Sequence, residues 1–85
     1  MPVISRFYGI IIAMYFNDHN PPHLHAKYAG QEAIFAFDGT IISGKLPVRA
    51  VNIIDEWISA HRMELLENWH RAQCGKPLNK IKPLE

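Results

Sequence analysis

Three histidines lie within seven residues of one another, and this segment is the part of the chain best suited to chemistry. His23 and His25 are separated by one residue, so on a β-strand both side chains lie on one face, about 6.6 Å apart along the chain. His19 precedes them across the stiff segment Asn20-Pro21-Pro22. Three imidazoles with an open fourth position are typical of a catalytic zinc or other divalent-metal site. We therefore regard His19, His23 and His25 as candidate ligands, with Asp18 as a further ligand or as the acceptor that fixes a histidine tautomer.

The same histidines also suit acid–base catalysis without a metal. His23 and His25 would then act as general base and acid in RNA cleavage, while Arg6, Tyr8 and Lys27 would support them and stabilise phosphate charge. A third interpretation is structural, with the imidazole rings bonded to main-chain carbonyls beside the prolines. The residues alone leave these three interpretations open, and with them the question of whether the chain is an enzyme.

Composition limits the classes of protein to which the chain can belong. Its 85 residues are expected to form a single domain, and 48% apolar with 20% charged residues is typical of a globular protein. Nine basic and eight acidic residues give a net charge of +1, which does not favour binding to nucleic acid or to an anionic membrane. The single cysteine, Cys74, excludes an intramolecular disulfide and a cysteine-cluster zinc site, and it suits a reducing compartment.

The apolar run from Phe7 to Phe16 is interrupted only by Gly9. It has the length of a signal-peptide core and is too short for a membrane span, and no cleavage site follows it. Its β-branched and aromatic residues favour a buried strand instead. We therefore expect a soluble, cytoplasmic protein without a membrane segment.

Strand-forming residues occupy the first half of the chain and helix-forming residues the second, which indicates an α+β fold. Strands are predicted at residues 4–16, with a bend at Gly9, and at residues 23–28, 31–37 and 40–43. Ala29-Gly30 is expected to form a two-residue hairpin turn, because Gly30 accepts the positive φ that such turns need. This turn pairs His25 with Ile34 and Leu24 with Phe35.

The predicted register divides the side chains of this hairpin between two faces. One face is apolar and would join the core: Leu24, Ala26, Tyr28, Ala33, Phe35 and Phe37. The other face is mixed and would turn the histidines outward: His23, His25, Lys27, Glu32, Ile34 and Ala36. An exposed Ile34 on that face would suit a homodimer or a partner protein.

Residues 47–74 are predicted to be helical, with Pro47 at the first position and Gly75 as the stop. The apolar side chains keep a helical spacing: Val51, Ile54, Ile58, Leu65, Trp69 and Ala72. An unbroken helix would be about 40 Å long, more than a compact domain of this size can cover, so a break is expected between Ser59 and Arg62. The expected architecture is a small antiparallel sheet of three to four strands packed against one long kinked helix or two helices. Residues 1–44 would be rich in strands and residues 75–85 would form an extended tail.

Segments spread over nearly the whole chain form a recognisable pattern. They are Ile4–Ile10, Met14–Phe16, Asp18–His25, Gly44–Pro47, Trp57, His61-Arg62, Glu64-Leu65, Asn68-Trp69 and Ile81–Leu84. This pattern resembles a family of short bacterial proteins known as domain-of-unknown-function family 4160. The resemblance implies a small protein often encoded beside a second one, as in toxin–antitoxin gene pairs, and it implies no residue roles.

Two functions of different classes remain. The function that we favour from the sequence is a component of a toxin–antitoxin-like pair that binds a cognate small protein from a neighbouring gene, or a second copy of itself. The alternative is a metal-binding or RNA-cleaving enzyme centred on His19, His23 and His25, with a divalent metal such as zinc as its cofactor.

Overall fold

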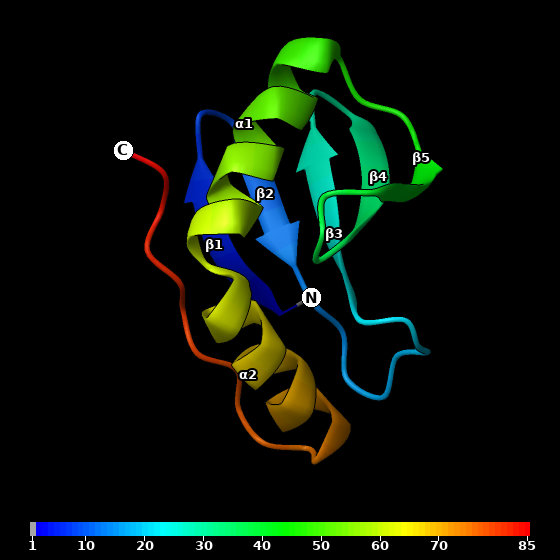
Figure 1. The fold of residues 1–85 in the computed structure, drawn as a ribbon, viewed down its shortest axis with the longest axis vertical. Helices are drawn as coiled ribbons and strands as arrows, with labels where there is room; N and C mark the ends of the chain where they lie inside the picture. Colours follow the sequence, from blue (N-terminus) through cyan, green and yellow to red (C-terminus); the bar gives the residue numbers. More distant parts are fainter. Residues whose placement is uncertain (1) are drawn as a thin grey trace.

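The computed structural model describes residues 2–85, which form one five-stranded antiparallel sheet with one helix across its face and a second helix that continues beyond the ends of the strands (Figure 1). The strands are β1 (Val3–Phe7), β2 (Ile10–Ala13), β3 (His23–Tyr28), β4 (Gln31–Ala36) and β5 (Ile41–Gly44), and the helices are α1 (Val48–Ala60) and α2 (Arg62–Gln73). The strands are adjacent in chain order, from β1 at one edge to β5 at the other. The α+β class is confirmed, with five strands where the sequence predicts three to four.

The extra strand arises because the predicted strand at residues 4–16 is two strands joined by a tight turn. Tyr8 and Gly9 both have positive φ, 52° and 79°, which is the geometry of a two-residue turn whose twist matches the flanking strands. The turn pairs Phe7 with Ile10 and Arg6 with Ile11. Gly9 therefore belongs to a turn between two strands, where the sequence predicts only a bend within one strand. The turn is hard to recognise because it lies in a continuous apolar run, without the polar residues that normally mark a turn.

The hairpin of β3 and β4 has the predicted register. Tyr28 pairs with Gln31 and His25 with Ile34 across the Ala29-Gly30 turn, and Ala29 shares the positive φ of Gly30. The apolar face joins the core as predicted, with Tyr28 half-buried. On the other face, however, Ile34 is half-buried and His23 is buried, so the prediction of an exposed Ile34 was wrong. The loop after β2 folds back over this face, where Tyr15 lies against His25 at a ring distance of 4.5 Å.

The helical region is divided near its middle, as predicted. His61 separates α1 from α2, and Trp57 and Trp69 are both buried in the core. Pro47 lies one residue before the first helical residue, and Gly75 follows the last turn with φ of 70°. In the part of the chain that the structure describes, neither helix has the length and apolar composition needed to cross a membrane.

The tail after α2 is fixed to the domain without forming a regular strand. The side chain of Asn68 is fully buried, donates a hydrogen bond to the Asn79 carbonyl and accepts one from the Asn79 backbone N–H, each at 2.8 Å. Further along, Ile81 donates its backbone N–H to the carbonyl of Ile4 on β1, and the indole of Trp57 donates to the Lys82 carbonyl. The tail therefore runs back along the β1 edge of the sheet (Figure 1).

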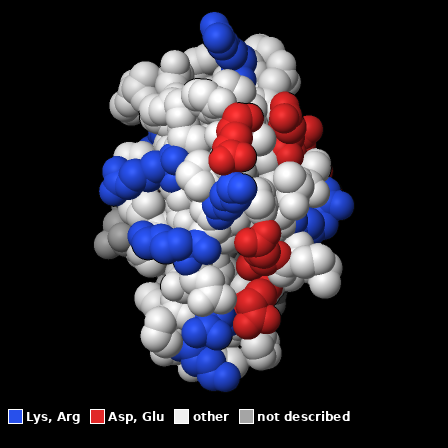
Figure 2. All heavy atoms as spheres, turned by 90° about the vertical axis from the view of Figure 1, so that its left-hand side faces the viewer, with Lys and Arg blue, Asp and Glu red and all other residues white. Residues whose placement is uncertain are grey.

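Charged side chains of both signs share the face seen from the β1 side. Figure 2 shows the acidic groups in a vertical column, with basic groups on either side of it. This face carries no field of a single sign, which agrees with the low net charge of +1.

Candidate metal centre

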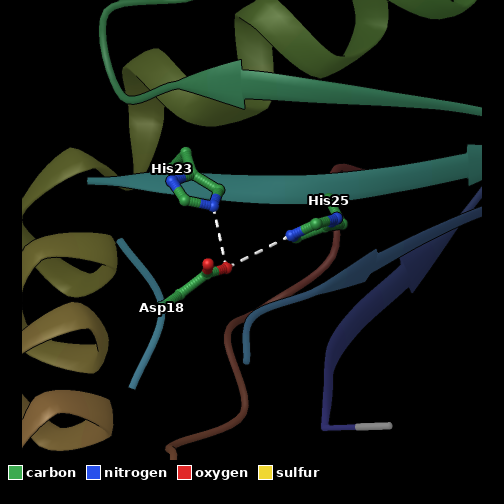
Figure 3. Close-up of side chains that lie close together, drawn as sticks. All are labelled: Asp18, His23 and His25. Carbon is green, nitrogen blue, oxygen red and sulfur yellow. Dashed lines mark hydrogen bonds and ion pairs between the residues drawn. The ribbon is translucent and has the colours of Figure 1, made fainter. Parts of the chain in front are cut away.

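Asp18, His23 and His25 converge on one point beside the first half of β3 (Figure 3). Strand alternation places both histidines on the same face of β3, and the loop that crosses this face supplies Asp18. The Nε2 atoms of His23 and His25 lie 2.8 Å and 3.4 Å from the same oxygen, Asp18 Oδ2. One ligand atom from each residue lies within 4.8 Å of the others.

The second nitrogen of each ring is also engaged. His23 Nδ1 lies 2.7 Å from the Pro21 carbonyl oxygen, and His25 Nδ1 lies 3.2 Å from Glu32 Oε2. A carbonyl or a carboxylate oxygen can only accept a hydrogen bond, so each ring faces an acceptor at both of its nitrogens. A neutral ring donates to only one of them, and a proton on Nδ1 leaves the Nε2 lone pair directed at Asp18.

These contacts have one chemical consequence. A lone pair on Nε2 and a lone pair on a carboxylate oxygen repel each other at 2.8 Å, so a positive charge must lie between them. That charge is either a proton on each imidazole or a metal ion held by all three groups. A histidine that donates Nδ1–H to a carbonyl or carboxylate and directs Nε2 at a common point is the usual arrangement of a metal-binding histidine.

Asp18 is held as a carboxylate by several donors. Its partial burial favours the neutral acid, but the hydrogen bond from the His19 backbone N–H and the contacts with the His25 and His23 rings outweigh that effect, and the pKa of Asp18 lies below its usual value. The amide of Gln73 on α2 donates to the Asp18 carbonyl at 3.1 Å, which ties this loop to the end of the helix. Asp18 is therefore both charged and fixed in position.

Two aromatic rings pack against the cluster. Trp69 of α2 lies 5.3 Å from the His23 ring and Tyr15 lies edge-on to His25. The side chains of His23, His25 and Asp18 remain 10%, 15% and 22% exposed. The cluster is thus shielded from bulk water but still reachable by a small ion or molecule.

The remaining predicted residues lie apart from this cluster. His19 is exposed and contributes its backbone N–H, rather than its ring, to Asp18. Arg6 and Lys27 share the face of the sheet with His25, because both pair with Ile11, but they belong to the next row of residues. Tyr8 lies in the β1–β2 turn, 60% exposed, beside a cleft on the helix side.

Glu32 and Trp69 are parts of the site that the sequence does not reveal as such. Glu32 is two residues from Ile34, the partner of His25, so it is a diagonal neighbour of His25 across the hairpin. The correct register therefore contained the signal for Glu32. No local pattern predicts that Trp69 reaches His23, since this contact depends on how α2 docks.

The comparisons with known proteins place this cluster inside a defined family. The model of the family described as Domain of unknown function (DUF4160) matches residues 9–70. The chain belongs to this family. The DUF4160 match contains Asp18, His23, His25 and Glu32, whereas β1 and the tail lie outside it. Searches of curated proteins and of solved structures find no significant match.

Proposed function

We propose that this DUF4160 protein binds one divalent transition-metal ion through Asp18 Oδ2, His23 Nε2 and His25 Nε2. The observation that carries the proposal is that both Nε2 atoms point at one carboxylate oxygen while both Nδ1 atoms are held by second acceptors. A proton on each ring satisfies the same contacts, and the experiment below separates the two cases.

The ligand set defines what such a centre can do. Two imidazoles and one carboxylate suit zinc, and the same three donors with open positions also suit ferrous iron. Three protein ligands leave positions for water or substrate, and a metal ion lowers the pKa of a bound water so that it becomes a nucleophile near neutral pH. A hydrolytic reaction at a small substrate is the chemistry that this arrangement favours.

Elemental analysis of the untagged protein, followed by zinc titration of metal-free protein above neutral pH, tests the proposal. We expect about one equivalent of metal in the wild type. Asp18→Asn and His25→Gln should each lower zinc affinity at least tenfold, because each removes one of three ligands. His19→Ala is the matched control, since this histidine is nearby but exposed and outside the cluster. Circular dichroism would establish that each variant is folded.

Two results would contradict the metal centre. One is wild-type protein that neither contains metal nor binds zinc more tightly than Asp18→Asn does. The other is loss of zinc binding in His19→Ala with retention in His25→Gln. Either result would leave the cluster as a pair of imidazolium rings held by Asp18 and Glu32.

Protein binding is a second candidate function, and strand β5 favours it. All four residues of β5 are exposed, and Ile41 and Ile42 are 39% and 46% exposed. The strand forms the outer edge of the sheet and carries no charged residue, although natural proteins usually protect such edges with charges or cover them. We propose that a small partner protein, such as the product of a neighbouring gene, adds a strand here.

A further inference from the structure

A cleft of about 590 Å³ lies at the far end of β3 from the metal centre. It is bordered by the β1–β2 turn, the end of β3, residues 49–56 of α1 and the last two residues of the tail, Leu84 and Glu85. Tyr28 and His23 are the last and first residues of β3, so about 16 Å of strand separates the cleft from the histidine cluster. The cleft falls within the size range of small-molecule sites, about 300–1,000 Å³.

The cleft combines an apolar floor with aromatic walls. Ile10 and Ala50 are buried at its base, and the rings of Tyr8 and Tyr28 line it. Gly9 lies directly against the Tyr28 ring, since a Cβ atom at this position would be 3.5 Å from it. The turn that joins β1 to β2 therefore packs against Tyr28, and both tyrosines line the cleft.

Tyr8 has an unusual backbone for a large side chain. Its φ of 52° lies in the left-handed region, which glycine, asparagine and aspartate adopt far more readily than tyrosine does. Ala29 has the same conformation in the second hairpin, and at both positions the two-residue turn imposes it. At this position the turn places Tyr8, which is 60% exposed, at the mouth of the cleft.

Polar groups of α1 face the same space. Arg49, Asn52 and Glu56 follow one another at intervals of three and four residues, so they share one side of the helix. Among residues 2–85, these three side chains and the hydroxyls of the two tyrosines have no hydrogen bond or ion-pair partner. Glu85, at the rim, is paired with Lys82 at 3.6 Å. Arg49, Asn52 and Glu56 are all exposed to solvent, so they are free to contact a ligand above the apolar floor.

We propose that this cleft binds a purine nucleotide. Tyrosine rings stack on nucleobases, and the Glu56 carboxylate accepts hydrogen bonds from adjacent N–H groups on the edge of the base, which favours guanine. Arg49 is suited to the phosphate. Seven residues separate Arg49 from Glu56, which is about 10.5 Å along α1, so one end of α1 faces the phosphate and the other the base.

The proposal is tested on the full chain by measuring the binding of guanosine monophosphate, with calorimetry for the affinity and NMR chemical shifts of the tyrosine rings for the site. We expect saturable binding that is at least fivefold tighter than the binding of guanosine or of adenosine monophosphate. In Arg49→Gln, guanosine monophosphate should bind no more tightly than guanosine. In Glu56→Gln, it should bind no more tightly than adenosine monophosphate. Tyr8→Asn keeps a residue that tolerates positive φ and removes the ring. It should therefore weaken the binding of guanosine monophosphate and of adenosine monophosphate at least fivefold.

Glu67→Gln is the matched control, because it removes an exposed helix carboxylate outside the cleft. The site is independent of the metal centre, so Asp18→Asn should bind the nucleotide as the wild type does. Absence of saturable binding at millimolar nucleotide would overturn the proposal. So would equal affinities in Tyr8→Asn and Glu67→Gln, or tighter binding of choline, a cation that an aromatic and acidic cleft would select instead.

Discussion

At the scale of single residues, each histidine of the proposed metal centre contacts an acceptor that is not one of the proposed ligands. His23 uses the Pro21 carbonyl, which belongs to the backbone and cannot be removed by mutation. His25 uses Glu32, whose side chain is 44% exposed and can be changed without opening the core. Glu32 is therefore the residue through which the orientation of the centre can be tested.

Glu32→Ala should weaken zinc binding about 10–100-fold, the usual cost of losing a group that orients a metal-binding histidine. Glu32→Gln should recover part of the affinity, because its amide oxygen still accepts from His25 Nδ1. Calorimetric zinc titration measures both, and Gln31→Ala is the control on the neighbouring exposed position. Equal affinities for Glu32→Ala and the wild type would show that His25 does not need Glu32.

The same scale shows why the sequence identified only part of the site. The one-residue spacing of His23 and His25 was sufficient to place both on one face, because a strand has a period of two residues. The choice between Asp18 and His19 had no such basis. Both lie in a loop in which Asn17 has a positive φ of 56°, and no repeat predicts which of two adjacent loop side chains turns inward.

At the scale of elements, turn chemistry decided where prediction succeeded. Ala29-Gly30 lies between Tyr28 and polar Gln31, where a turn is easily recognised, and the register that followed from it was correct throughout the hairpin. Tyr8-Gly9 forms the same kind of turn inside an apolar run, so the strand count was too low. The break at His61 was predictable from length alone, since the helical region exceeds the width of the domain.

The tail depends on one buried amide of α2. Asn68→Ala should lower the free energy of unfolding by about 1–3 kcal/mol, because it leaves the Asn79 N–H and carbonyl without partners. Urea denaturation measures this loss, and limited proteolysis should show earlier cleavage after residue 75. An exposed substitution on the same helix, Glu67→Ala, should change neither. Unchanged stability of Asn68→Ala would mean that water replaces the amide at little cost.

At the scale of the whole molecule, the two edges of the sheet are unequal. The tail covers β1, where Ile81 and the Lys80 ammonium group donate to backbone carbonyls of Ile4 and Val3. The β5 edge has no such cover among residues 2–85, and its pairing to β4 contains a register shift that bends it. Any pairing partner on β5 is therefore expected to add a short strand.

Ile42→Lys should weaken this partner contact at least tenfold while leaving the domain folded, because Ile42 is exposed and the lysine adds a charge to the edge. Two experiments measure the contact: co-purification of the untagged protein with the partner that we propose, the product of a neighbouring gene, and sedimentation of the protein on its own. Val48→Lys is a control, since Val48 is a more exposed apolar residue outside the sheet. A complex that survives Ile42→Lys but not Val48→Lys would move the interface to the start of α1.

The strapped tail has a consequence for assembly. A sheet with two unpaired edge strands can bind a further subunit at each edge and grow into a fibril. A sheet with one unpaired edge can bind only one further subunit through edge pairing. Because Ile81 already pairs with the β1 edge, we expect this chain to form dimers and not larger assemblies through its sheet edges. Residues 76–85 would thus limit assembly through the sheet edges to two subunits.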